Sequence, residues 1–157
     1  MVASSKVRQI TVILVDDHEM MRQGIKNILS RDRGVMIVGE ASEGPEALSL
    51  IAELQPDIAL LDIRLREGSG IDVVRGCQDL GLSTKLLVVS AYDDEHYVKS
   101  MVRLGVRGYL VKSASGRELR RAVRDIAEGH LVFPCGVADK VIDVLSVGEG
   151  QSFRNRP

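Results

Sequence analysis

The sequence predicts an α/β fold, with one doubly wound, five-stranded parallel sheet and helices on both of its faces. Short runs of consecutive apolar residues alternate five times with stretches whose apolar residues recur at helical spacing. Runs that are apolar at every position are typical of strands buried on both faces, as in parallel sheets covered by helices. The 157 residues, 45% of them hydrophobic and only 3% aromatic, suffice for one domain with an aliphatic core.

The first half of the pattern contains two strand–helix units. The run ITVILV predicts a strand at Ile10–Val15, and the helical spacing that follows predicts a helix at Met20–Leu29. A second strand is expected at Val35–Val38 and a second helix at Glu46–Leu54. Pro45 suits the first turn of that helix, because an N–H is not needed there.

The third and fourth units follow the same alternation. A third strand is expected at Ile58–Leu61, and the third helix is expected at Ile71–Leu80, with Gly81 at its end. Lys85–Val89 predicts the fourth strand, and His96–Leu104 predicts the fourth helix. Each connection is short, so right-handed crossovers place the helices on the two faces of the sheet.

The fifth unit is followed by a weaker pattern. Tyr109–Val111 predicts the last strand and Glu118–Glu128 the last helix, which Gly129 ends. Val137–Val147 has the spacing of one more amphipathic helix, and Gly148–Pro157 resembles a disordered tail. We therefore expect a leader at 1–8, one domain at 9–130, and a linker helix with a disordered tail at 131–157.

Composition argues for the cytoplasm and against several partners. The net charge of −1 gives no general reason to expect binding to nucleic acid or to an acidic surface. Cys77 and Cys135 have no metal-ligand spacing and are expected to be free thiols in a reducing compartment. Neither a signal peptide nor an apolar run of about 20 residues is present, so no contact with a membrane is expected.

Five polar side chains stand at the ends of the predicted strands. Asp16 and Asp17 follow the first strand, Asp62 the third, Ser90 the fourth and Lys112 the fifth. Ligands of open α/β sheets bind at the carboxyl ends of the strands, so these side chains should converge. Three carboxylates repel one another unless a cation joins them, and Mg²⁺ suits such an oxygen-rich site. A carboxylate beside Mg²⁺ and a lysine can attack a phosphoryl group.

Three stretches resemble a known family. VDDHEMMRQGI (Val15–Ile25), ASEGPEAL (Ala41–Leu48) and GYLVK (Gly108–Lys112) resemble the receiver domains of NarL/LuxR-type two-component response regulators. The resemblance extends over roughly Arg8 to His130. It implies a flavodoxin-like sheet with strand order 2-1-3-4-5 and a domain that accepts a phosphoryl group from a sensor histidine kinase.

The resemblance also implies a role for each site residue. Asp62 resembles the phosphoacceptor, which also binds Mg²⁺. Asp17 is similar to the direct metal ligand, and Asp16 to the ligand that acts through water. The backbone carbonyl of Arg64 corresponds in position to a third metal ligand. Lys112 is similar to the phosphoryl-binding lysine.

Four side chains are expected to take part in switching and in the later loss of the phosphoryl group. Ser90 resembles the hydroxyl that moves to the phosphoryl group, and Tyr109 the aromatic ring that turns inward with it. Arg64 and Tyr92 stand two residues beyond Asp62 and Ser90. Their bulk beside the phosphoryl group suggests that they set the lifetime of the phosphate.

The chain departs from the family at two places. Leu65 and Arg66 replace the usual Met-Pro, although Gly70 is kept, so the loop after Asp62 is expected to be less rigid. Ser113 follows the lysine where many receivers have a proline in a cis bond, and the geometry of this bond is left open.

Simpler interpretations exist for several residues. Asp16-Asp17 could be a helix cap, Tyr109 a packing residue, and His18 a local structural residue. A basic stripe on the last helix is either a solvated face or a contact surface. It consists of Arg117, Arg120, Arg121 and Arg124.

The expected protein is a phosphoacceptor switch with self-catalysed phosphorylation and dephosphorylation rather than an enzyme. The resemblance implies a homodimer through the first and fifth helices after phosphorylation, and control of transcription through a DNA-binding domain. We expect that domain to be absent, because the sequence ends shortly after Val147. The chain is then either an excised receiver, which we favour, or a natural chain that acts through protein contacts.

Three alternatives are weighed against this function. A haloacid-dehalogenase-type phosphatase also uses an Asp nucleophile and Mg²⁺, but its acidic pair comes late and it needs room for a cap domain. A flavin-binding electron carrier shares the fold class, but Asp16-Asp17 would repel a phosphate after the first strand. The third alternative is a receiver-like interaction module that is never phosphorylated.

Overall fold

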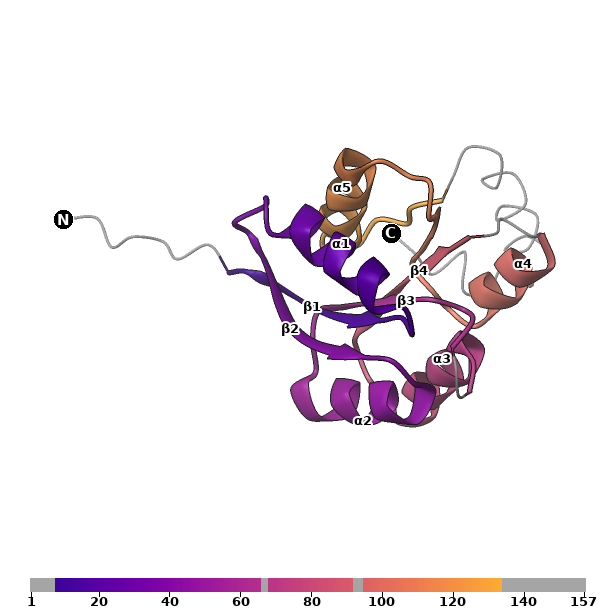
Figure 1. Ribbon diagram of the computed structural model, residues 1–157. Coiled ribbons are helices and arrows are strands. Elements are labelled where there is room, and N and C mark those ends of the chain that lie inside the picture. Colours follow the sequence, from indigo (N-terminus) through magenta and orange to yellow (C-terminus); the bar gives the residue numbers. More distant parts are fainter. Residues whose placement is uncertain (1–7, 66–67, 92–94, 134–157) are drawn as a thin grey trace.

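The computed structural model describes residues 8–65, 68–91 and 95–133, apart from the side chains of 95–97. Its centre is a five-stranded sheet in which all strand pairs are parallel and the order is β2-β1-β3-β4-β5 (Figure 1). The strands are β1 (Ile10–Val15), β2 (Val35–Ala41), β3 (Ile58–Leu61), β4 (Lys85–Ser90) and β5 (Gly108–Val111). The predicted fold class and strand order are confirmed.

Helices cover both faces of the sheet. They are α1 (Glu19–Leu29), α2 (Gly44–Leu54), α3 (Gly70–Asp79), α4 (Glu95–Arg103) and α5 (Gly116–Ala127). Figure 1 shows α1 and α5 together on one face, with α2 and α3 on the other. The predicted helix limits agree with the structure to within two residues. The strand β2 is longer than predicted because its end at the sheet edge is half exposed and accommodates Gly39 and Glu40.

Two apolar layers hold the helices against the sheet. The layer under α1 and α5 includes Ile25, Leu29 and Val123, and the opposite layer joins Ile51, Val74 and Met101 from α2, α3 and α4. The two sets share only the strands, whose alternating side chains enter one layer or the other. Burial of the strands on both sides explains why their sequences are continuous apolar runs.

Helix ends follow the chemistry of the sequence. Ser69 begins α3 with a capping box to Asp72, so two backbone N–H groups of that first turn are satisfied. Gly81, Gly105 and Gly129, which follow α3, α4 and α5, have φ angles of 64°, 89° and 97°. Glycine is favoured at such positions because a Cβ is strained in the left-handed region. The helix ends predicted at Gly81 and Gly129 are confirmed, and Gly105 follows α4 in the same conformation.

The chain turns back along the sheet after α5. Gly129 redirects the backbone, and Val132 forms a parallel bridge with Gly108 at the free edge of β5. At the other end of the described chain, Arg8 pairs with Asp57 at 2.7 Å. The predicted leader, apart from Arg8, and the predicted linker helix at Val137–Val147 lie outside the described residues.

Within these described residues, no helix combines the length and apolar character needed to cross a bilayer. Cys77 is buried in the core as a free thiol, and burial raises its pKa. Cys135 lies outside the described part of the chain.

Candidate functional site: an acidic cavity at the strand ends

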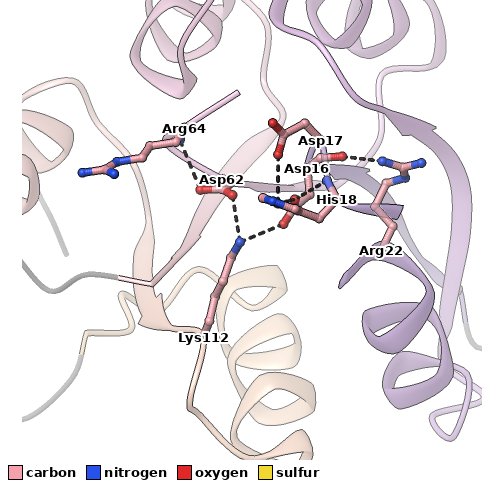
Figure 2. Close-up of polar contacts among 7 residues, drawn as sticks. All are labelled: Asp16, Asp17, His18, Arg22, Asp62, Arg64 and Lys112. Atoms are coloured by element: carbon pink, nitrogen blue, oxygen red, sulfur yellow. Dashed lines mark hydrogen bonds and ion pairs between the residues drawn. The ribbon is translucent and has the colours of Figure 1, made fainter. Parts of the chain in front are cut away.

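The predicted site residues converge at the carboxyl ends of β1, β3, β4 and β5. A cavity of about 260 Å³ opens there. It is lined by Asp17, His18, Asp62, Arg64, Leu65, Ser90, Ala91 and Lys112. Figure 2 shows Asp16 and Asp62, from two strand ends, facing the amine of Lys112 from a third, whereas Asp17 faces the ring of His18. Parallel strands bring distant residues together here because their carboxyl ends share one edge of the sheet.

Lys112 joins two of the carboxylates. Its Nζ lies 2.8 Å from Oδ2 of Asp62 and 3.1 Å from Oδ2 of Asp16. Both aspartates are buried, with exposed fractions of 6% and 4%. Desolvation alone would lower the pKa of the Lys112 ammonium, but the hydrogen bonds and charges of Asp62 and Asp16 outweigh it and raise the pKa. The ammonium therefore stays charged beside the two acids.

The turn after β1 is organised by Asp16 and His18. Oδ1 of Asp16 accepts the backbone N–H of His18 at 2.9 Å, and the His18 ring Nδ1 lies 3.2 Å from the same oxygen. His18 is the residue that precedes α1, and its side chain makes no capping bond. The alternative that Asp16 and Asp17 merely form the N-cap is therefore wrong. The expectation of a local structural role for His18 agrees with these contacts.

The donor set fits a hard divalent cation. Asp16, Asp17, His18 and Asp62 each offer a ligand atom, and these atoms lie within 4.8 Å of one another. Oδ1 of Asp17 is buried and accepts no hydrogen bond, although Nδ1 of His18 lies 3.0 Å away. A buried carboxylate oxygen without a hydrogen-bond donor is costly unless a cation approaches it. Carboxylate oxygens in a cavity open to water are typical ligands for Mg²⁺.

The loop after β3 is held close to Asp62 by its backbone. Arg64 donates its N–H to Oδ1 of Asp62 at 3.1 Å, and Gly70 donates to the carbonyl of Ile63 at 2.7 Å. A Cβ on Gly70 would lie 2.5 Å from the Asp62 carbonyl oxygen, so only glycine allows α3 to begin there. The side chain of Arg64 is exposed and points away from Asp62 in Figure 2. Leu65 packs partly against the core, whereas Arg66 lies outside the described residues.

The two predicted switch residues are both buried. Ser90 ends β4, lines the cavity and is 3% exposed. The ring of Tyr109 is completely buried in the layer that includes Val98 and Met101 of α4. Tyr92, the predicted lifetime residue, lies outside the described residues. The peptide bond that joins Lys112 to the following serine is trans.

Arg22 is a site neighbour to which the sequence analysis assigned no role. Its Nη1 donates to the backbone carbonyl of Asp16 at 2.5 Å, and its Nε donates to Oε1 of Glu40 at 3.1 Å. Arg22 is part of the VDDHEMMRQGI stretch and stands four residues after His18, which brings it back over the turn. This spacing was the available signal, but the partner Glu40 on β2 could not be read from it.

The basic stripe on α5 is partly engaged within the molecule. Arg124 binds Asp32 through Nε at 2.6 Å and through Nη2, and Arg121 lies 3.8 Å from Asp125. The turn after α1 brings Asp32 beside α5, but Arg124 remains exposed, so this contact does not decide between a solvated face and a contact surface.

Comparison with known proteins gives the family. The family model for the response regulator receiver domain matches residues 12–124, which is most of the chain. The chain belongs to this family. More particularly, it is a receiver domain of the NarL/LuxR type and a component of two-component signalling.

Individual relatives agree with this assignment. The DNA-binding transcriptional activator DevR/DosR of Mycobacterium tuberculosis is 36% identical over 121 residues, which is 77% of this chain and 56% of that protein. The nitrate/nitrite response regulator NarL of Escherichia coli K12 is 33% identical over 122 residues, 78% of this chain and 56% of that protein. The chain thus spans about half the length of the curated relatives it matches.

Solved structures show the same fold. The signal receiver domain of NarL from Mycobacterium tuberculosis has a TM-score of 0.76 and 36% identity, covering 78% of this chain and 99% of that one. A LuxR-family response regulator from Aurantimonas sp. has a TM-score of 0.80 and 27% identity, covering 86% and 96%. Family membership decides against the phosphatase and the flavin carrier. The alternative of a receiver-like module without phosphorylation is addressed by experiment below.

Proposed function

We propose that Asp62 accepts a phosphoryl group from a phosphohistidine of a sensor histidine kinase and so switches the domain. The observation that carries the proposal is the 2.8 Å contact between Nζ of Lys112 and Asp62, inside an acidic cavity where an oxygen of Asp17 lacks a hydrogen-bond donor. Asp17, Asp62 and the backbone carbonyl of Arg64 would hold Mg²⁺, with Asp16 acting through water. When bound, Mg²⁺ supplies positive charge that neutralises the phosphoryl oxygens.

The chemistry is a transfer followed by a hydrolysis. A carboxylate oxygen of Asp62 attacks phosphorus, the P–N bond to the histidine breaks, and the imidazole nitrogen leaves with the electron pair and takes up a proton. Lys112 and Ser90 then bind the phosphoryl oxygens of the acyl phosphate. Water later attacks phosphorus and releases inorganic phosphate and the Asp62 carboxylate. Arg64 and Tyr92, which stand two residues beyond Asp62 and Ser90 in the sequence, are proposed to set the rate of this hydrolysis, and the switch then resets without a separate enzyme.

Phosphorylation changes the balance between two conformations of the domain. Ser90 and Tyr109 form the switch pair, in which the hydroxyl moves to the phosphoryl group and the ring follows inward. The burial of Tyr109 beside α4 residues supports this role, because any movement of the ring must rearrange that packing. The altered surface then comprises α4, β5 and α5.

The output is a homodimer that controls transcription. The proposed contact uses α1 and α5, between which lies a mainly apolar cavity of about 110 Å³ that includes Met21, Ile28 and Leu119. The relatives named as transcriptional regulators support a DNA-binding domain that follows the receiver, joined through the linker at 131–157. We place the protein in the cytoplasm, where a sensor kinase presents its phosphohistidine.

Intact mass after incubation with acetyl phosphate and Mg²⁺ tests the function. The parent protein is expected to gain one phosphoryl adduct, which EDTA abolishes and which Asp62→Asn does not form. Asp57→Asn is a matched control, because Asp57 binds Thr11 and Arg8 at the opposite end of the sheet. An adduct on Asp62→Asn would contradict the assignment of Asp62 as the acceptor. No adduct on a parent that binds the cation would leave two interpretations, a receiver that accepts phosphate only from its kinase and the unphosphorylated module.

A further inference from the structure

The turn that carries Asp16 and Asp17 is held by the side chain of an arginine, Arg22, from the first turn of α1. In many helices the residue before the first turn accepts a backbone N–H through its side chain, which fixes the entering chain. His18 occupies this position before α1 and makes no such bond. The backbone N–H of Arg22 closes the first turn on the carbonyl of His18 at 3.1 Å, and the guanidinium of the same residue reaches further back.

The guanidinium of Arg22 connects two elements. Nη1 donates to the Asp16 carbonyl at 2.5 Å, and Nε donates to Oε1 of Glu40 at 3.1 Å. Figure 2 shows Arg22 extending from α1 to the backbone of the acidic turn. The Arg22 side chain is 17% exposed and the Glu40 side chain 35%, so solvent screens the pair with Glu40 more than the part-buried contact with the Asp16 carbonyl. A planar guanidinium can hold both acceptors at once, whereas an amine is a single point of charge.

Glu40 is itself fixed in place. It stands opposite Leu14 in the β1–β2 register, and its second oxygen accepts Nζ of Lys26 at 2.8 Å. The hydrogen bond from Lys26, followed by the one from Arg22, keeps the pKa of Glu40 below its ordinary value despite partial burial. The carboxylate therefore stays charged, and it anchors Arg22 to the rigid edge of the sheet.

We propose that Arg22 is a positioning residue for the divalent cation: supported by Glu40, it holds the Asp16 carbonyl and so orients the Asp16 and Asp17 carboxylates within the cluster that they form with Asp62. This inference rests on the proposed function, since it assumes a cation at these carboxylates. Arg22 binds the backbone of the turn to which the two carboxylate side chains are attached. Lys26 binds the same Glu40, but among the contacts of the described residues it reaches no atom of that turn. The two cations of α1 thus have different roles.

This difference supplies a matched pair of variants. Arg22→Met and Lys26→Met each keep an apolar stem of similar length and each remove one ion pair to Glu40. Binding of Mn²⁺ to the folded full chain, followed by the EPR signal of the free ion, reports the cation site without requiring phosphorylation. Arg22→Met is expected to weaken Mn²⁺ binding about tenfold, the lower range for residues that orient metal ligands. Lys26→Met should leave the affinity within about twofold.

Thermal unfolding of both variants separates positioning from stability. We expect similar losses of thermal stability but a loss of Mn²⁺ affinity in Arg22→Met alone. Equal Mn²⁺ affinities for the two variants would overturn the inference, whether both match the parent or both are weakened. If Arg22→Met does not fold, Arg22→Lys replaces it and should bind Mn²⁺ with an affinity between those of the parent and Asp17→Asn. A parent that binds no Mn²⁺ would instead reject the proposed function itself.

Discussion

The backbone N–H of Tyr109 donates to the carbonyl of Val132 at 2.9 Å, which ties the segment after α5 to the strand that carries the expected switch residue. Val132 in turn donates to the carbonyl of Arg107 at 3.0 Å. Gly108 makes this approach possible, because a Cβ there would lie 2.8 Å from Cδ1 of Ile126 and 3.0 Å from the Val132 oxygen. The edge of β5 is thereby covered by the chain's own backbone.

Gly108→Ala is expected to destabilise the domain. The added methyl group would force apart the β5 edge, the core and the returning segment, so the free energy of unfolding should fall by about 1–3 kcal/mol. Gly24→Ala is the matched control, since its added Cβ in the middle of α1 would lie within 4 Å of no atom other than those of its chain neighbours and the helix's own backbone. That change should raise the free energy of unfolding by about 0.5–1 kcal/mol. Urea unfolding measures both effects. A Gly108→Ala variant more stable than the parent would contradict the conclusion that Gly108 allows the returning segment to approach β5.

Asp17→Asn should stabilise the protein in EDTA. The change removes one of three clustered carboxylates and the charge on a buried oxygen without a hydrogen-bond donor. In excess Mg²⁺ the parent should be the more stable of the two proteins. Its free energy of unfolding rises by about 2.7 kcal/mol when Mg²⁺ is at 100 times its dissociation constant. Thermal unfolding with EDTA or Mg²⁺ measures both effects. In the exposed control Asp79→Asn, Mg²⁺ should raise the thermal stability as much as in the parent. If Mg²⁺ raises the stability of Asp17→Asn by the same amount, Asp17 is not a ligand of the cation.

Lys112→Met should lower the free energy of unfolding in EDTA by about 3 kcal/mol, because Asp16 and Asp62 would keep buried charges without their ammonium partner. Mg²⁺ should recover part of this loss, since the cation replaces the missing positive charge. Urea unfolding in both media provides the measurement. A variant as stable as the parent in EDTA would mean that the lysine does not compensate the acids.

The pair of Asp32 and Arg124 gives a prediction for pH. The hydrogen bond from Arg124 is the largest cause that keeps the pKa of Asp32 below its ordinary value of 3.8. A lowered pKa stabilises the folded state at pH values above 3.8, and this contribution is lost as pH falls through the folded value. Asp32→Asn should therefore cost stability at pH 7 and progressively less below pH 4. The cost should stay below about 1 kcal/mol, because Arg124 is half exposed and screened by solvent.

Urea unfolding of the parent and Asp32→Asn between pH 2.5 and 7 provides this test. If the free energies of unfolding of the two proteins differ by the same amount at every pH, the charge of Asp32 contributes nothing to stability. Asp125→Asn is a suitable control, since its partner Arg121 is 82% exposed and 3.8 Å away. Its effect should be close to zero at every pH.

The strand runs and the five polar residues after them were enough to predict the sheet, its helices and the convergence of Asp16, Asp17, Asp62, Ser90 and Lys112. This succeeds because local periodicity determines which segments are strands, and parallel strands necessarily align their carboxyl ends. The helix stops were predictable for a similar reason, since glycine tolerates the left-handed conformation wherever it occurs.

Only the tertiary structure decided which distant groups meet. The contact of Arg22 with Glu40, the pair of Arg124 and Asp32 from elements 92 residues apart, and the bond from Tyr109 to the returning chain all depend on how helices and edges are placed around the sheet. The sequence by itself determined the elements and the identity of the site, because those follow from periodicity and strand direction. The supports of the site follow from distances through space, which no local pattern contains.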